Sequence, residues 1–470
     1  MISKKLYNSL KVYILILIAF NLIFISMGQI NRWDLLEQVS MADNYIKNGF
    51  FYPNPESKEL FGTSIYYPGV SFLSFFFIKI IPSSYLIEFL YLIAIFFIFL
   101  LLYIQRHLIQ LHFKRYSVLK FYIFSVFSFF IINNDWLIYA CEFKPDTIAF
   151  CIGALGIIIA NVDMNSKEIN YPKFILGFLL TGIAICFKQQ YVSLILGLLI
   201  FSIINTNIKL RIFTILTIIT CLITLVAINN IPFQWFWNIT ILQDDGLLSA
   251  ITVIKNNSNL IPKIFFYLTL IYISNKSTFI KNINLKYHFL HSPWLVITIS
   301  VLFFSILSSI KIGGNAGNTE FGLVLLLPFT FYSIRKIIDI KFVYIFILFF
   351  SLFTMYNFNK KIIHYLNYRQ SIDFVEKIKI RQNKKILTGS NVYGISRVFI
   401  ENANILNFNT YSLLDNKSHS IKLETLMNDE SFDLIIIDNE KSNLTLINSY
   451  ANYEIIFKNS IVLIAKSIEK

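Results

Sequence analysis

The chain has 470 residues and a formal charge of +14, and its composition is 56% apolar and only 14% charged. Ordinary soluble domains carry about 25% charged residues. The mean hydropathy of +0.62, with many apolar runs of membrane-spanning length, excludes a water-soluble fold. The basic residues lie in short loops between apolar runs, so no nucleic-acid partner is expected.

The apolar runs predict an all-α polytopic membrane bundle of about 11 transmembrane helices. The predicted spans lie near residues 11–30, 84–105, 117–133, 146–162, 173–187, 190–206, 211–229, 259–274, 294–310, 320–334 and 341–356. The first run lacks a small-residue cleavage site, which favours an uncleaved span over a signal peptide. Residues 69–82 are too short for a span and are expected to form an interfacial or re-entrant helix.

Loops rich in Lys and Arg alternate along the chain with loops that are poor in them. By the positive-inside rule, the basic loops lie in the cytoplasm. The opposite, outer side then receives the loop 31–83 and everything after residue 357. The sequence therefore predicts a protein of the cytoplasmic (inner or plasma) membrane with its N-terminus inside and its C-terminal part outside.

The last part of the chain, residues 357–470, has a different pattern. The runs KKILTG, DLIIID and YEIIFKNSIVLIAK are typical of strands and alternate with helix-compatible segments. We expect a small α/β extracytoplasmic domain here, after a transmembrane domain at residues 1–356. This tail contains no GxGxxG, P-loop or HExxH motif, so we assign it no catalytic role.

The predicted outer loops and helix ends collect a set of polar residues. Ionisable groups near membrane depth are costly and are usually functional or paired. The candidate site residues are Asp34, Glu37, Glu142, Lys144, Asp146, Lys188, Gln189, Asn315 and Glu320. Because all of them belong to one face of the membrane, they predict a cavity that opens outward.

These residues also have simpler structural interpretations. Asp34 and Glu37 fit a solvated helix start, where acids complement the helix dipole. Asp146 follows a proline and fits the first turn of a helix. Lys188 fits an interfacial lysine whose ammonium reaches water. The six His residues show no ligand spacing, so no zinc site is expected.

The order of these segments resembles that of the outer motifs of GT-C-fold glycosyltransferases, a superfamily that includes protein mannosyltransferases and aminoarabinose transferases. The stretch from Asp34 to Tyr66-Tyr67-Pro68 is similar to their first outer loop, which has an acid after the first helix and a Tyr-Pro element. Residues 142–146 are similar to the second acidic element, 182–190 to a glycine-helix-lysine turn, and 313–320 to a later outer motif.

The resemblance implies inverting transfer of a sugar from a polyprenyl-phosphate carrier to a glycan, lipid or protein acceptor on the outer face. It implies Asp34 as the general base, and Lys188 with Lys144 at the donor phosphate. The substrate-binding residues that it implies are Glu37, Tyr66, Tyr67, Glu142, Asp146, Gln189, Asn315 and Glu320. Tyr66 and Tyr67 also fit an interfacial aromatic belt.

The sequence departs from the usual motifs in the first loop. It has Tyr-Tyr-Pro-Gly where many members have Tyr-Pro-Pro or Lys-Pro-Pro, and it has no Asp-x-Asp pair. No cofactor is therefore assigned, and the need for a divalent cation stays open. A non-catalytic role in envelope polysaccharide assembly and a secondary transporter also stay open. A transporter should carry its charged groups near helix centres and in repeated broken helices.

Overall fold

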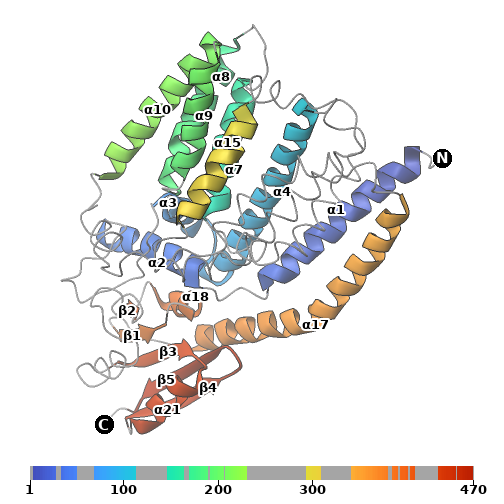
Figure 1. The fold of residues 1–470 in the computed structure, drawn as a ribbon. Coiled ribbons are helices and arrows are strands. Elements are labelled where there is room, and N and C mark those ends of the chain that lie inside the picture. Colours follow the sequence, from blue (N-terminus) through green and yellow to red (C-terminus); the bar gives the residue numbers. More distant parts are fainter. Residues whose placement is uncertain are drawn as a thin grey trace.

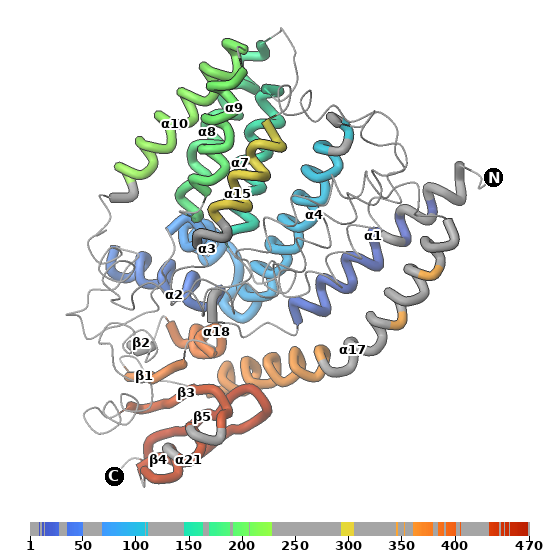
Figure 2. The backbone as a smooth tube through the Cα atoms, in the orientation of Figure 1, coloured from blue at the N-terminus to red at the C-terminus, as the bar shows by residue number. Residues whose placement is uncertain are grey.

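The computed structural model describes residues 4–27, 33–49, 68–112, 145–162, 169–188, 191–205, 207–229, 293–308, 340–378, 384–389, 392–400, 403–407, 432–450 and 452–468 (Figure 2). This part of the chain is mostly helical (Figure 1). Its helices of ten or more residues are α1 (Lys4–Met27), α2 (Trp33–Asn48), α3 (Gly69–Ile78), α4 (Leu86–His112), α7 (Pro145–Ala160), α8 (Tyr171–Ile183), α9 (Val192–Ile204), α10 (Ile208–Asn229), α15 (Pro293–Ser308) and α17 (Ile340–Lys377).

Each predicted span that falls on described residues coincides with a helix, and α17 continues beyond the predicted 341–356 to Lys377. By length and hydropathy, two described helical segments, Ser83–Leu108 and Ile208–Ala227, are long and apolar enough to cross a membrane. The predicted spans at 117–133, 259–274 and 320–334 lie outside the described residues. The count of about 11 spans therefore stays a prediction.

The outward side of α10 is apolar. It exposes Ile208, Ile212, Ile215, Ile219, Leu222, Ile223 and Val226, whereas Phe213 on the same helix is buried. Large contiguous apolar patches on a protein surface mark a membrane or a partner. Together with the composition, this face indicates a helix that packs against lipid.

Close packing of small residues joins α7 to α8. A Cβ atom added at Gly156 would lie 2.5 Å from the Gly177 carbonyl oxygen, and one at Gly177 would lie 2.6 Å from the Ala160 Cβ. The Thr181 hydroxyl also donates to the Gly153 carbonyl at 3.2 Å. Such small-residue contacts let membrane helices approach closely, and here they pack the second half of α7 against α8.

Two short helices, α2 and α3, lie across one end of the helix group, and the C-terminal sheet lies beyond them (Figure 1). The expectation of a short helix within 69–82 is confirmed by α3. The Ser71 hydroxyl of α3 donates to Gln38 Oε1 of α2 at 2.7 Å, and both side chains are buried. This contact ties the two helices of the predicted first outer loop together.

The C-terminal part contains a five-stranded sheet with the order β2-β1-β3-β5-β4. Its strands are β1 (Lys384–Thr388), β2 (Ala403–Asn407), β3 (Leu434–Asp438), β4 (Tyr453–Lys458) and β5 (Val462–Ser467). β1 pairs in parallel with β2 and β3, and β5 pairs antiparallel with β3 and β4. The predicted small sheet is confirmed, although β2 was not predicted.

The predicted division at 356/357 falls inside α17, which runs without a break toward the sheet. Two short helical turns, α18 (Tyr393–Ser396) and η6 (Arg397–Phe399), follow β1 and face α2. Helix α21 (Lys441–Ser449) follows β3. The division of the chain into two domains stays a prediction.

Candidate functional site

Two of the predicted site residues, Asp146 and Lys188, meet in the structure. Lys188 Nζ lies 3.2 Å from Asp146 Oδ2, across 42 residues of sequence. The lysine side chain is only 3% exposed, whereas the Asp146 side chain is 17% exposed. A buried ammonium is costly unless it is paired, and the carboxylate that pairs with it here remains within reach of solvent.

The local sequence explains how these two residues come together. Pro145 is the first residue of α7. A proline is well tolerated there, because the backbone N–H groups of the first turn make no hydrogen bond within the helix. Asp146 thus lies in the first turn, at the positive end of the helix dipole. On the other side, α8 tightens into the 3₁₀ turn η3 (Ala184–Cys186) and ends just before Lys188.

The beginning of α3 packs directly on the turn that precedes Lys188. A Cβ atom added at Gly69 would lie 2.7 Å from the Cys186 carbonyl oxygen and 2.9 Å from the Phe187 ring. Only a glycine allows this approach without a shift of the backbone. The end of the predicted first outer loop is therefore held next to the Lys188–Asp146 pair.

The predicted base lies on α2. Asp34 is the second residue of this helix, a position that suits an acid at a helix start; the described part of Asp34 is its backbone. Glu37, one turn later, is buried with 4% of its surface exposed. Since Gln38 joins α2 to α3, and α3 contacts the Lys188 turn, a continuous set of contacts links α2 to the Lys188–Asp146 pair.

The other predicted site residues lie outside the described residues, and their roles stay predictions. They are Lys144, Tyr66, Tyr67, Glu142, Gln189, Asn315 and Glu320. Within the described ranges, no group of three His, Cys, Asp or Glu side chains is placed to hold a metal ion.

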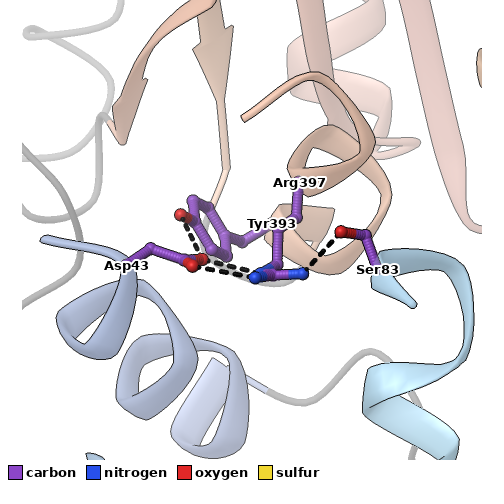
Figure 3. Close-up of polar contacts among 4 residues, drawn as sticks. All are labelled: Asp43, Ser83, Tyr393 and Arg397. Carbon is purple, nitrogen blue, oxygen red and sulfur yellow. Dashed lines mark hydrogen bonds and ion pairs between the residues drawn. The ribbon is translucent and has the colours of Figure 1, made fainter. Parts of the chain in front are cut away.

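A second buried ion pair, which the sequence did not predict, joins α2 to the C-terminal part (Figure 3). Arg397 Nε donates to Asp43 Oδ2 at 2.7 Å, and Arg397 Nη2 donates to Asp43 Oδ1 at 2.9 Å. The Tyr393 hydroxyl donates to Asp43 Oδ2 at 3.1 Å, and Arg397 Nη1 donates to the Ser83 hydroxyl at 2.9 Å. The Asp43 and Arg397 side chains are 1% and 3% exposed.

Burial raises the pKa of the Asp43 carboxyl, and the Arg397 guanidinium opposes that shift by charge and by hydrogen bonding. Burial, followed by the nearby carboxylate, raises the pKa of the Tyr393 hydroxyl well above its usual range. Tyr393 therefore stays protonated and acts as a donor. One sequence signal could have revealed the pair: Arg397 interrupts the otherwise apolar YGISRVFI, and a buried arginine requires a carboxylate partner.

No family model matches the chain, and no curated protein matches it by sequence. Two solved structures of ArnT from Cupriavidus metallidurans share its fold. The first, bound to undecaprenyl phosphate, has a TM-score of 0.56 and 8% sequence identity, and the match covers 97% of this chain and 98% of that one. The apo structure has a TM-score of 0.54 and 9% identity over the same shares. The resemblance predicted from the sequence is thus confirmed as one of fold: over nearly its whole length the chain has the GT-C fold of ArnT.

Proposed function

We propose that this protein is a membrane glycosyltransferase that moves a sugar from a polyprenyl-phosphate-linked donor to an acceptor on the outer face, with inversion. The observation that carries the proposal is the whole-length fold that the chain shares with an ArnT structure bound to undecaprenyl phosphate. The acceptor is a glycan, a lipid or a protein. The orientation follows from the distribution of basic loops.

The reaction is a single displacement at the anomeric carbon of the sugar. An acceptor hydroxyl oxygen attacks this carbon while the bond to the phosphate oxygen breaks, and the polyprenyl phosphate leaves with the bonding electron pair. Asp34 takes the proton of the attacking hydroxyl as general base. Attack opposite to the departing phosphate inverts the configuration of the sugar.

Lys188 stabilises the charge that develops on the leaving phosphate. Fixed cations at the site of developing charge act strongly because they need no reorganisation during the reaction. The Lys188 ammonium is held by Asp146 at 3.2 Å, and its buried position limits competition from water. Lys144 precedes α7 by one residue in the sequence and is proposed to assist at the same phosphate.

The remaining predicted residues bind the substrates. Glu37 and Asp146 orient sugar or acceptor hydroxyls, together with the predicted Glu142, Gln189, Asn315 and Glu320. Tyr66 and Tyr67 precede Pro68 and α3 and are proposed to stack on the sugar or line the entrance for the lipid. Aromatic faces suit both roles because they are apolar and rigid.

The test is consumption of radiolabelled polyprenyl-phosphate sugars by the purified protein, followed by the same assay with Asp34→Asn. If Asp34 is the base, transfer should fall on the order of 100-fold or more, with normal expression and membrane insertion. Asp373→Asn is the matched control, because this acid on α17 is 57% exposed; it should leave transfer unchanged. Near-normal turnover by Asp34→Asn would remove the base assignment, and no consumption by the wild-type protein would favour a non-catalytic or transport role.

A further inference from the structure

Helix α2 buries polar as well as apolar side chains. Five of its polar side chains are buried: Glu37, Gln38, Ser40, Asp43 and Asn44. A buried polar contact depends on donor and acceptor geometry much more steeply than an apolar contact does. The position of α2 therefore depends on the groups that its polar side chains meet.

At its C-terminal half, α2 is held by the C-terminal part of the protein. Arg397 grips both carboxylate oxygens of Asp43, at 2.7 Å and 2.9 Å, which is the bidentate geometry that fixes orientation as well as distance. The same guanidinium also reaches Ser83, in the 3₁₀ turn η1 (Ser83–Tyr85) that precedes α4. One side chain thus joins three separate segments (Figure 3).

The segment that carries Arg397 is itself firmly seated. The Ser396 and Thr388 hydroxyls lie 2.6 Å apart, which ties α18 to strand β1. A Cβ atom added at Gly394 would lie 3.0 Å from the Tyr368 hydroxyl, 3.1 Å from Ile87 and 3.2 Å from Leu36. These neighbours belong to α17, α4 and α2, so α18 is wedged among three helices.

We propose that Arg397 is a positioning residue for the reaction: by gripping Asp43 it holds α2 and sets the place of Asp34 relative to the Lys188–Asp146 pair. The inference rests on the proposed function. Asp34 and Asp43 lie nine positions apart on one helix, or about 13 Å along its axis. Because a helix of this length moves as a rigid rod, a change at Asp43 displaces the acid at the other end. Misplacement of about 1 Å can reduce a rate on the order of 100-fold.

The experiment compares wild type, Arg397→Gln and Arg397→Lys in lipid nanodiscs, with two readouts. The first is hydrogen exchange of the α2 backbone amides, and the second is steady-state transfer from a polyprenyl-phosphate sugar. Arg397→Gln should speed exchange in residues 33–48 about 10-fold or more and lower kcat on the order of 10- to 100-fold. KM for the donor should change little. Arg397→Lys keeps the positive charge but cannot donate to both carboxylate oxygens as the guanidinium does. Its exchange rate and its kcat should therefore lie between those of wild type and Arg397→Gln.

Arg369→Gln is the matched control. Arg369 on α17 contacts α4 through Glu88 at 3.2 Å and η1 through the Ser84 carbonyl, but neither contact involves α2. This variant should leave α2 exchange and kcat unchanged. If Arg397→Gln also leaves α2 exchange and kcat unchanged, the proposal is overturned. If Arg397→Gln does not fold, the same two measurements on Arg397→Lys decide.

The two readouts separate this proposal from the proposed function. If the wild-type protein transfers no sugar, the proposed function fails and α2 exchange alone decides. Exchange that rises more in α2 than in the other helices of the Arg397 variants then supports the positioning role. Exchange that rises no more in α2 than in the other helices overturns it.

Discussion

The Lys188–Asp146 pair and the Asp43–Arg397 pair are both built on a buried cation, yet their carboxylates differ. Both oxygens of Asp43 accept hydrogen bonds from Arg397, Tyr393 adds another, and the carboxylate is 1% exposed. Asp146 meets Lys188 at 3.2 Å and keeps 17% of its side chain exposed. A carboxylate enclosed on all sides serves the fold. A carboxylate that is open to solvent can separate from its cation, so that an incoming phosphate can bind the cation instead. The comparison predicts that substitutions at the Asp43–Arg397 pair lower stability strongly, whereas substitutions at the Lys188–Asp146 pair lower transfer with little loss of stability.

The largest expected effect on stability is that of Arg397→Gln. Removing one partner of a buried ion pair costs about 3–5 kcal/mol, measured as a lower midpoint of denaturant unfolding in detergent. Without the guanidinium, only the Tyr393 hydrogen bond and the Lys47 charge oppose the effect of burial, so the pKa of Asp43 should rise further. The folded variant then holds a proton that the unfolded chain releases above about pH 4. Its stability should therefore decline as pH rises from 4 toward 8, relative to wild type; a deficit that is independent of pH would contradict this account.

Lys188→Met should lower transfer with little loss of stability. Transfer should fall on the order of 100- to 1000-fold, as for the loss of one group that stabilises transition-state charge. Unfolding stability should change by less than about 1 kcal/mol, because Asp146 can be solvated once the ammonium is gone. The assay and the unfolding curve are measured on the same preparation. A large loss of stability with normal transfer would make Lys188 a residue that serves the fold alone.

Gly69→Ala tests the contact between α3 and the Lys188 turn. The added methyl group would lie 2.7 Å from the Cys186 carbonyl oxygen, which is backbone and cannot rotate away. Overpacking of this kind costs about 1–3 kcal/mol. Because the displaced turn carries Lys188, transfer should fall together with stability. Wild-type values for both would show that α3 is not seated on this turn.

The smallest effect is expected for Lys384→Ala, which serves as the reference for the three substitutions above. Lys384 and Asp433 form an ion pair of 2.6 Å in the sheet, but their side chains are 34% and 37% exposed. An exposed pair contributes about 0–1 kcal/mol, so Lys384→Ala should shift the unfolding midpoint only slightly and should leave transfer unchanged. A shift as large as that of Arg397→Gln would mean that burial does not distinguish the ion pairs of this protein.

Hydropathy predicted the helices well because apolar length is a direct consequence of the lipid core. The sheet was mostly predictable as well, since the β1, β3, β4 and β5 segments are runs of aliphatic residues. Strand β2 escaped prediction because Ala403–Asn407 is flanked and ended by asparagines, which are rare in strands. Its pairing with β1 compensates for that weak local preference.

The contacts of the candidate site could not be predicted from the sequence, and the membrane side assigned to it stays a prediction. The alternation of basic loops placed Asp146 and Lys188 on one membrane face, and their ion pair is consistent with that placement. Asp43 was missed because α2 resembles a solvated polar helix in sequence, whereas its polar residues are buried. Its partner lies 354 positions away, and contacts between such distant residues leave no periodic signal in the chain.

Helix α17 favours the long-range contact between Arg397 and Asp43. It passes from beside α1 to the region beneath α18 (Figure 1), and its 38 residues contain neither glycine nor proline. A flexible tether would present Arg397 to Asp43 at an effective concentration of about millimolar. A continuous helix confines the arginine to a far smaller volume and so raises that concentration. Asp43 and Arg397 then meet with little loss of conformational freedom, although 354 positions separate them in the sequence.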